Sequence, residues 1–327
     1  MTPVDHPSPP PARTVHTRTG VLAGLTAYGL WGLFPFYFHA LRSAGALELL
    51  AWRIVFSLAL SVVLVTALRR WARVAAVLRS PAQRGLLVAA AVAVAVNWGV
   101  YGLAVVRGHV LEAALGYFVN PLLTVLLGVL VLRERLRPGQ WVAVGTGLVA
   151  VAVITADLGR LPWMALTVAV SFAAYGLLKN QLGRRGGGVD PLTGLTVETA
   201  VLLVPAVAAL LVLGLGSGHG VTFAAEGPWH TTLLVLAGPT TLVPLVLFAT
   251  AAARVPLSVI GMLQYVTPVL QFVAALLLGE TMPASRWIGF ALVWLALAVL
   301  TADALRQQGL GVRRESPRGH PGTVRGP

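Results

Sequence analysis

The chain has 327 residues, of which 57% are hydrophobic and only 11% charged, and its mean hydropathy is +0.82. Soluble domains carry about a quarter charged residues, so this composition excludes an ordinary soluble protein and predicts an all-α, polytopic membrane protein. The formal net charge of +13 does not indicate a nucleic-acid partner, because the basic residues lie between apolar runs and in the tails, where they orient membrane proteins. The absence of cysteine excludes disulfides and thiolate chemistry.

Ten apolar runs of about 18–24 residues follow one another along the chain, and each is long enough to cross a hydrocarbon core of about 30 Å. Residues 1–20, which are polar and proline-rich, and residues 306–327, which are basic, predict disordered cytoplasmic tails. We expect transmembrane helices at 21–41, 46–68, 85–106, 110–132, 140–157, 161–182, 190–213, 230–253, 256–278 and 286–305.

The distribution of lysine and arginine supports this number of spans. With the N-terminus in the cytoplasm, 19 of these residues fall in cytoplasmic loops and tails and 4 on the outer side, with Arg53 left inside a span. Cytoplasmic loops of membrane proteins are enriched in basic residues. The sequence therefore predicts ten spans, with both termini in the cytoplasm.

The chain also contains an internal repeat. The tetrapeptide AYGL occurs at 27–30 and again at 174–177, a shift of 147 residues, which Arg107 and Arg254 share with Pro121 and Pro268. Each half, 21–157 and 158–305, holds five expected spans, an odd number, so the second half enters from the opposite face. Inverted five-helix repeats are typical of secondary transporters, whose substrate site lies near the bilayer midplane between the halves.

Long stretches also match a known family in order, including AYGLWGLFPFYFHAL at 27–41, the segment 97–141 that begins NWGVYGLAVVRGHVLEAALGYFVNP, and TTLVPLVLFATAAARVPLSVIGMLQYVTPVLQFVAALLLGE at 240–280. In these stretches the chain resembles the RarD group of the EamA family, in the drug/metabolite transporter superfamily. The resemblance implies an inner-membrane secondary transporter with a tie to chloramphenicol sensitivity or resistance. Trp52 stands before Arg53 where a histidine is common in that family, and His39 stands where a lysine is more common.

Arg53 and Glu198 lie about seven and eight residues into their expected spans, and at such depth each charge costs about 2.5–3.5 kcal/mol unless a partner or a watery cavity compensates it. We expect Arg53, in 46–68, to bind an anionic or polar part of a substrate. Glu198, in 190–213, is expected to pair with Arg53 or to take up a coupling proton; the alternative is a structural ion pair between the halves. Glu112, beside His109, is a second candidate for proton coupling, and its alternative is a solvated acid at a helix start.

Polar and aromatic side chains at helical spacing predict the walls of a substrate pathway, because an amphiphilic solute needs apolar surface and a few placed polar partners. The alternative is that these groups join helices by hydrogen bonds. Prolines inside spans kink helices and are candidate hinges. The pathway candidates, besides Arg53 and Glu198, are Tyr28, Trp31, Asn97, Trp98, Tyr101, Tyr117, Asn120, Tyr175, Gln264 and Gln271; the hinge candidates are Pro35, Pro121 and Pro268, and Pro244 also lies inside a span.

These observations favour a non-enzymatic carrier that exports a small amphiphilic metabolite or drug, with protons as a candidate driving ion. No GxxxxGK[ST] phosphate loop is present, which argues against an ATP-driven pump. Uptake of amino-acid-like solutes is the alternative, followed by a channel or a membrane scaffold. We expect no cofactor and no metal, and the partners are a small-molecule substrate and the lipid bilayer. A homodimer could form through helix faces made of small residues.

Overall fold

The computed structural model describes residues 14–132, 136, 138–184, 189–216, 220–252, 254 and 263–314. Every regular element in this part of the chain is a helix, which confirms the expected all-α class. The elements are α1 (Thr14–Gly32), α2 (Phe34–Ala40), the 3-10 turn η1 (Arg42–Ala44), α3 (Gly45–Ala67), α4 (Trp71–Arg79), α5 (Pro81–Val106), α6 (Val110–Leu132), α7 (Pro138–Leu158), α8 (Trp163–Arg184), α9 (Pro191–Leu215), α10 (Gly227–Val235), α11 (Ala237–Ala252), α13 (Val266–Leu277) and α14 (Ala284–Arg314).

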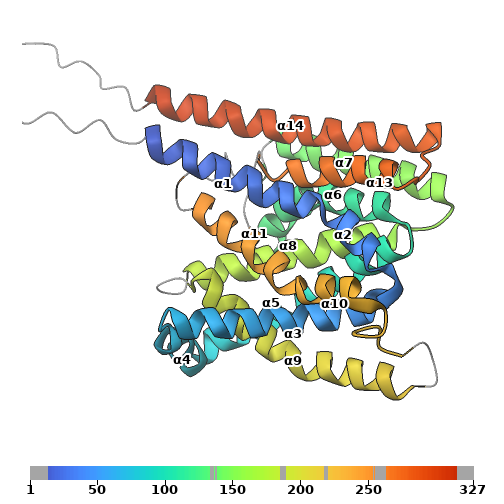
Figure 1. Cartoon of the computed structure of the whole chain (residues 1–327). Coiled ribbons are helices and arrows are strands. Elements are labelled where there is room, and N and C mark those ends of the chain that lie inside the picture. The colour runs from blue at the N-terminus through green and yellow to red at the C-terminus, as the bar shows by residue number, and fades with distance from the viewer. Residues whose placement is uncertain are drawn as a thin grey trace, which may run out of the picture.

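Eight helical segments are long and apolar enough to cross a membrane, which confirms a polytopic membrane protein. Two further apolar segments, Trp163–Lys179 in α8 and Val266–Leu277 in α13, are shorter. The expected run 256–278 lies partly outside the described residues, so the number of ten spans stays a prediction. Figure 1 shows the start of α1 and the end of α14 at the same end of the bundle, as an even number of crossings requires. We call this the terminal end, and the other the loop end.

Helix starts on the terminal side follow signals that the sequence carries. Pro81 and Pro191 stand at the first positions of α5 and α9, preceded by the capping residues Ser80 and Asp190. The Thr193 N–H donates to Asp190 Oδ1 at 3.1 Å, as a capping carboxylate should accept. Partial burial acts to raise the pKa of the Asp190 carboxyl, but hydrogen bonds from Thr193 and two nearby arginines hold that pKa below its ordinary value.

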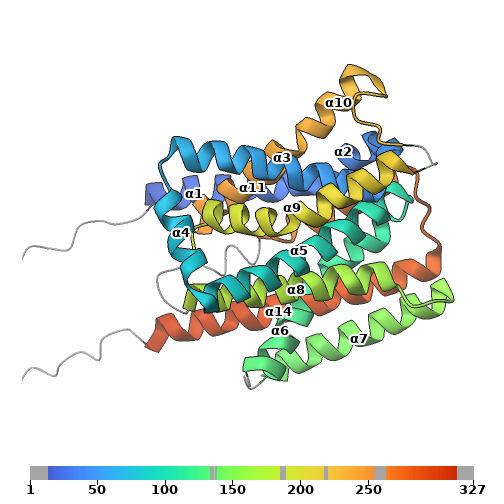
Figure 2. The same cartoon turned by 90° about the horizontal axis from the view of Figure 1, so that it is seen from below.

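A short helix that the sequence did not predict, α4, forms within the expected cytoplasmic loop 69–84. Val74 and Val77 are buried on one side of α4, while Arg73 is exposed. Figure 2 shows α4 at the terminal end of the bundle. The basic loop, the start of α1 and the end of α14 therefore share one side of the protein.

The helices pack in pairs drawn from both halves of the chain: α7 with α14, α5 and α6 with α8, α3 with α9, and α1 with α11 and α13 (Figures 1 and 2). Small residues allow the closest approaches. A Cβ atom at Gly116 of α6 would lie 2.6 Å from the Ala165 carbonyl oxygen of α8, so only glycine fits there. Close contact at glycine is a common way for membrane helices to associate.

The outer surface of the bundle is apolar. Leu215 is 86% exposed, Val204 75% and Leu277 72%. Exposed leucine and valine on helices of this length indicate contact with lipid tails. Buried polar residues such as Glu198 lie on the same helices, so these helices have an apolar face toward lipid and a polar face toward the interior.

The prolines occupy different positions in their helices. Pro35 follows the break at Leu33 between α1 and α2, and Pro121 lies inside α6. The expectation that Pro268 lies in the middle of a helix is wrong for the described residues, because α13 begins at Val266 and Pro268 lies in its first turn, where a missing N–H costs little.

Candidate functional site

Arg53 on α3 is the most unusual charge in the structure. Only 5% of the residue is exposed. Its Nε donates to Thr241 Oγ1 of α11 at 2.9 Å. The guanidinium carbon lies 4.0 Å from the centre of a Trp98 ring, 5.3 Å from the Phe34 ring and 5.6 Å from the Phe38 ring. We call these three rings the aromatic cage.

The charge of Arg53 has no carboxylate partner among the described residues. A guanidinium has five N–H donors, and within this part of the chain only Nε makes a hydrogen bond. Contacts with aromatic faces return about 2 kcal/mol or more to a desolvated cation, which helps to keep Arg53 buried. The terminal nitrogens remain able to donate to an anionic oxygen.

Two buried hydroxyl groups near Arg53 also lack a partner within the described residues: Ser57 Oγ, one turn along α3, and Tyr101 OH on α5. Tyr101 packs on the aromatic cage, with its ring 5.5 Å from Phe38. Buried polar groups in proteins are almost always hydrogen-bonded, so these two hydroxyl groups, unpaired among the described residues, could bond a polar group of a bound molecule.

Glu198 on α9 pairs with a different cation from the one expected. Its carboxylate accepts from Lys179 Nζ at 2.7 Å and from Tyr175 OH at 3.2 Å, both on α8. The predicted Arg53–Glu198 pair is therefore wrong, because Lys179 occupies the carboxylate. A Cβ atom at Gly194 would lie 2.9 Å from Lys179 Nζ, so this glycine leaves room for the ammonium group.

The sequence also carries a signal for Lys179. This residue is one of the 19 lysines and arginines counted on the cytoplasmic side, yet it lies within the expected span 161–182, four residues after Tyr175 and therefore on the same helix face. Its Nζ lies 5.4 Å from the Tyr175 ring centre.

A row of aromatic rings connects the two charged groups. Neighbouring ring centres are between 5.5 Å and 6.3 Å apart. Arg53 contacts the first rings of the row, and Glu198 accepts a hydrogen bond from the last. In order, the rings are Phe34, Phe38, Tyr101, Tyr117, Phe172 and Tyr175.

The two buried asparagines join helices. Asn97 Nδ2 donates to the Val168 carbonyl of α8 at 3.0 Å, and Tyr117 OH donates to Asn97 Oδ1 at 3.1 Å. Asn120 Nδ2 donates to the Ala169 carbonyl at 3.1 Å. These bonds favour the alternative of polar contacts between α5, α6 and α8, although Tyr117 also belongs to the aromatic row.

The candidates on α1 and α13 meet at the α1–α2 break. A proline at position 35 removes the N–H that would bond to the Trp31 carbonyl, and Gln271 Nε2 donates to this carbonyl at 3.2 Å. The Tyr28 carbonyl accepts from Thr267 Oγ1 at 2.8 Å. Gln271 thus supplies the hydrogen bond that Pro35 removes from the Trp31 carbonyl at the helix break. The buried Oε1 of Gln271 has no partner within the described residues. Gln264 lies half-buried in the turn before α13.

Carboxylates tie the segments at the loop end together. Glu112 accepts from Arg160 Nη2 at 2.7 Å and from the Met164 N–H at 3.0 Å, so it caps the start of α8. Glu280 accepts from the N–H groups of Val110 and Leu111 at the start of α6. These contacts give Glu112 a structural partner on both oxygens, whereas His109 is exposed.

Glu48 on α3 is a buried carboxylate that the sequence analysis missed. It accepts from the N–H groups of Thr222 and Phe223 at 2.9–3.2 Å and from Trp52 Nε1 at 3.1 Å. Thr222 Oγ1 also lies 2.8 Å from His230 Nε2. The sequence did carry a signal for Glu48, because this acidic residue is the third residue of the expected span 46–68.

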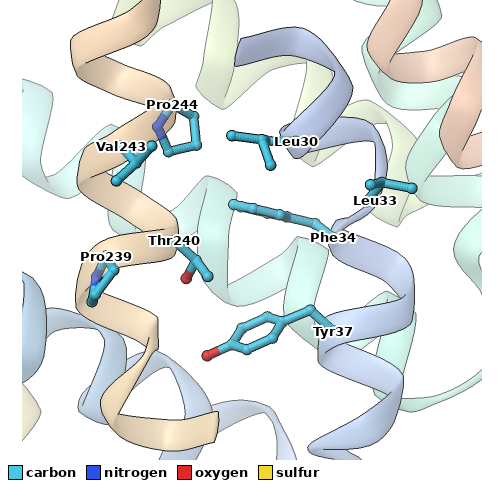
Figure 3. A pocket seen from close by; sticks show the side chains of 8 residues that line it. All are labelled: Leu30, Leu33, Phe34, Tyr37, Pro239, Thr240, Val243 and Pro244. Atoms are coloured by element: carbon cyan, nitrogen blue, oxygen red, sulfur yellow. The ribbon is translucent and has the colours of Figure 1, made fainter. Parts of the chain in front are cut away.

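A groove opens beside the aromatic cage, between α1–α2 and α11 (Figure 3). Its volume is about 290 Å³. We call it the lateral groove, and its lining residues are Leu30, Leu33, Phe34, Tyr37, Pro239, Thr240, Val243 and Pro244. Within the described residues, no group of three or more His, Cys, Asp or Glu side chains could hold a metal ion.

Comparison with known proteins extends this picture. Residues 18–156 match the EamA-like transporter family. The chain is 51% identical to Protein RarD of Streptomyces exfoliatus over 88% of this chain and 90% of the relative. It is 44% identical to an uncharacterized transporter of Pseudomonas aeruginosa over 90% of this chain and 96% of the relative. A crystal structure with 22% identity and a TM-score of 0.57, covering 90% of this chain and 99% of the other, has the same fold.

Proposed function

Because the chain belongs to the RarD group of the EamA-like transporter family, we propose that it is a secondary carrier that exports a small amphiphilic metabolite or drug across the cell membrane by alternating access. The observation that carries this proposal is Arg53, a buried cation in an aromatic cage without a carboxylate partner among the described residues. Arg53 binds an anionic or strongly polar group of the substrate, and the surrounding rings bind its apolar part.

The packing of the helices supports two inverted repeats. Under the shift of 147 residues, α1 corresponds to α8, α3 to α9, α5 to α11, α6 to α13 and α7 to α14. Exchange of the halves turns the α5–α8 pair into α11–α1 and leaves α3–α9 and α7–α14 unchanged, and all of these pairs are in contact. Transporters with such repeats expose a central site to each side in turn, with Pro35 and Pro121 as hinge positions.

Glu198 takes up the coupling proton in this proposal. A protonated Glu198 carries no charge to hold the Lys179 ammonium, which now lies 2.7 Å away. Proton binding would therefore release Lys179 and loosen the contact between α8 and α9. The aromatic row from Arg53 to Tyr175 provides the physical connection between the substrate group and the proton group.

Solute exchange by purified protein in liposomes tests the carrier activity. The panel contains aromatic monocarboxylates, amino acids and chloramphenicol, each measured by counterflow. We expect exchange of at least one anionic or polar amphiphile, a loss of at least tenfold with Arg53→Gln, and partial recovery with Arg53→Lys. Arg84→Gln, a change of an exposed arginine at the start of α5, is the matched control. Exchange that is equal in Arg53→Gln and Arg84→Gln would refute the role of Arg53, and no exchange of any solute would refute the carrier.

The proton role of Glu198 has a separate test. In Glu198→Gln liposomes we expect exchange without a gradient to continue, while a pH gradient no longer drives net accumulation. Glu112→Gln is the comparison, because Glu112 has structural partners on both oxygens. If the pH gradient drives transport equally well in Glu198→Gln and in the native protein, Glu198 does not carry the coupling proton.

A further inference from the structure

The lateral groove opens toward lipid. Leu33 and Val243 at its mouth are 51% and 47% exposed, and they lie on the same apolar outer surface as the lipid-facing residues of the other helices. Six of its eight lining residues are leucine, proline, phenylalanine or valine. A water-soluble molecule would gain little in this groove, whereas an apolar chain already dissolved in the bilayer would fit it.

The backbone itself holds the groove open. On one side, α1 ends at Gly32 and α2 begins at Phe34, so the chain changes direction beside the groove. On the other side, Pro244 lies inside α11, while Pro239 lies in the first turn of this helix. Because prolines and helix breaks prevent two helices from packing along their full length, the gap is a feature of the main chain and not of one side-chain rotamer.

The inner wall of the groove is also the wall of the aromatic cage. Phe34 lines the groove, and its ring centre is 5.3 Å from the Arg53 guanidinium carbon. On α11, Thr240 lines the groove and the next residue, Thr241, accepts from Arg53 Nε. Figure 3 shows Phe34 and Tyr37 extending from α2 toward α11 across the gap. One aromatic ring therefore separates the lipid-facing groove from the buried cation.

We propose that the lateral groove binds the apolar chain of an anionic amphiphile, a monocarboxylate with a long apolar tail, whose acid group reaches Arg53 past Phe34. The charge complementarity of Arg53 selects an acid over the zwitterionic lipids that surround the protein. The substrate would then enter from the bilayer instead of from water. This inference rests on the proposed role of Arg53 and adds a route and a substrate class to it.

Photolabelling in lipid nanodiscs tests the proposal directly. The probe is hexadecanoic acid with a diazirine in its chain, and the labelled residues are located by peptide mass spectrometry. We expect labels on groove residues of α1, α2 and α11, and competition by dodecanoate but not by added phosphatidylcholine. We expect Arg53→Gln to reduce groove labelling at least tenfold, and Arg53→Lys to retain most of it.

A second variant tests the groove without changing the charge. Val243→Trp fills the groove and should abolish its labelling, whereas Val204→Trp, a change at a residue of α9 that is 75% exposed, should leave it unchanged. Groove labelling that persists in Arg53→Gln, or that phosphatidylcholine competes away, would mean that ordinary lipid tails fill the groove and would overturn the proposal.

Failure of the proposal and failure of the carrier function are distinguishable. If counterflow depends on Arg53 but the groove is never labelled, the carrier stands and the lateral route is refuted. If the groove is labelled in an Arg53-dependent way but Val243→Trp exchanges long-chain carboxylates as fast as the native protein, the groove is not on the transport route.

Discussion

Replacement of Glu48 by alanine should strongly destabilise the loop end of the bundle. Glu48 is 1% exposed and lies in the first turn of α3. Its carboxylate accepts from four donors, which are the Thr222 N–H, the Thr222 hydroxyl, the Phe223 N–H and Trp52 Nε1. Trp52 also stacks on Phe223, with ring centres 4.4 Å apart. The segment before α10 is thus attached to α3 at one carboxylate.

The magnitude follows from the groups that the variant leaves unpaired. Each buried donor without an acceptor costs about 1–3 kcal/mol, and Glu48→Ala strands two backbone N–H groups as well as the indole. We therefore expect a loss of about 3–5 kcal/mol in the free energy of unfolding. Glu48→Gln keeps the shape and one acceptor oxygen but loses the charge, so about 1.5–3 kcal/mol is expected.

Reversible unfolding in mixed micelles, followed by circular dichroism and tryptophan fluorescence, measures these differences. Leu47→Ala is the control in the same helical turn, because Leu47 is 52% exposed and packs little. The reasoning would be refuted if Glu48→Ala fell within about 0.5 kcal/mol of Leu47→Ala, since surface changes stay within that range. We also expect the free energy of unfolding to increase in the order Glu48→Ala, Glu48→Gln, native protein.

Three further outcomes are expected. Lys179→Met leaves a buried carboxylate uncompensated and should cost about 3 kcal/mol, and adding Glu198→Gln should recover most of it; additive losses in the micelle unfolding assay would contradict a direct pair. Asp190→Ala should cost about 1 kcal/mol at pH 7. Because the pKa of Asp190 is lowered in the fold, this difference is present above the unfolded pKa of about 4 and should shrink as the pH falls below it, and a constant difference in melting temperature would contradict this account. Gly116→Ala should cost about 1–3 kcal/mol by overpacking, while Gly29→Ala, where a Cβ meets nothing within 4 Å, should cost nothing; equal melting temperatures would contradict the close contact.

The sequence was sufficient for the properties that depend on short stretches of chain. Apolar runs located the membrane helices that the structure describes, and the resemblance identified the family. The rule that a charge inside a span needs a reason also selected Arg53 and Glu198 without knowledge of their surroundings. Each of these inferences uses only a residue and its close neighbours in the chain.

Only the tertiary structure decided which groups meet. Glu198 bonds Lys179 and not Arg53, Glu48 turned out to hold a distant loop, and the lateral groove arises where α2 and α11 diverge. The physical reason is that helix–helix contacts depend on the rotation and crossing of each helix. Many residue pairs set these angles together, so hydropathy and spacing along one helix do not contain them.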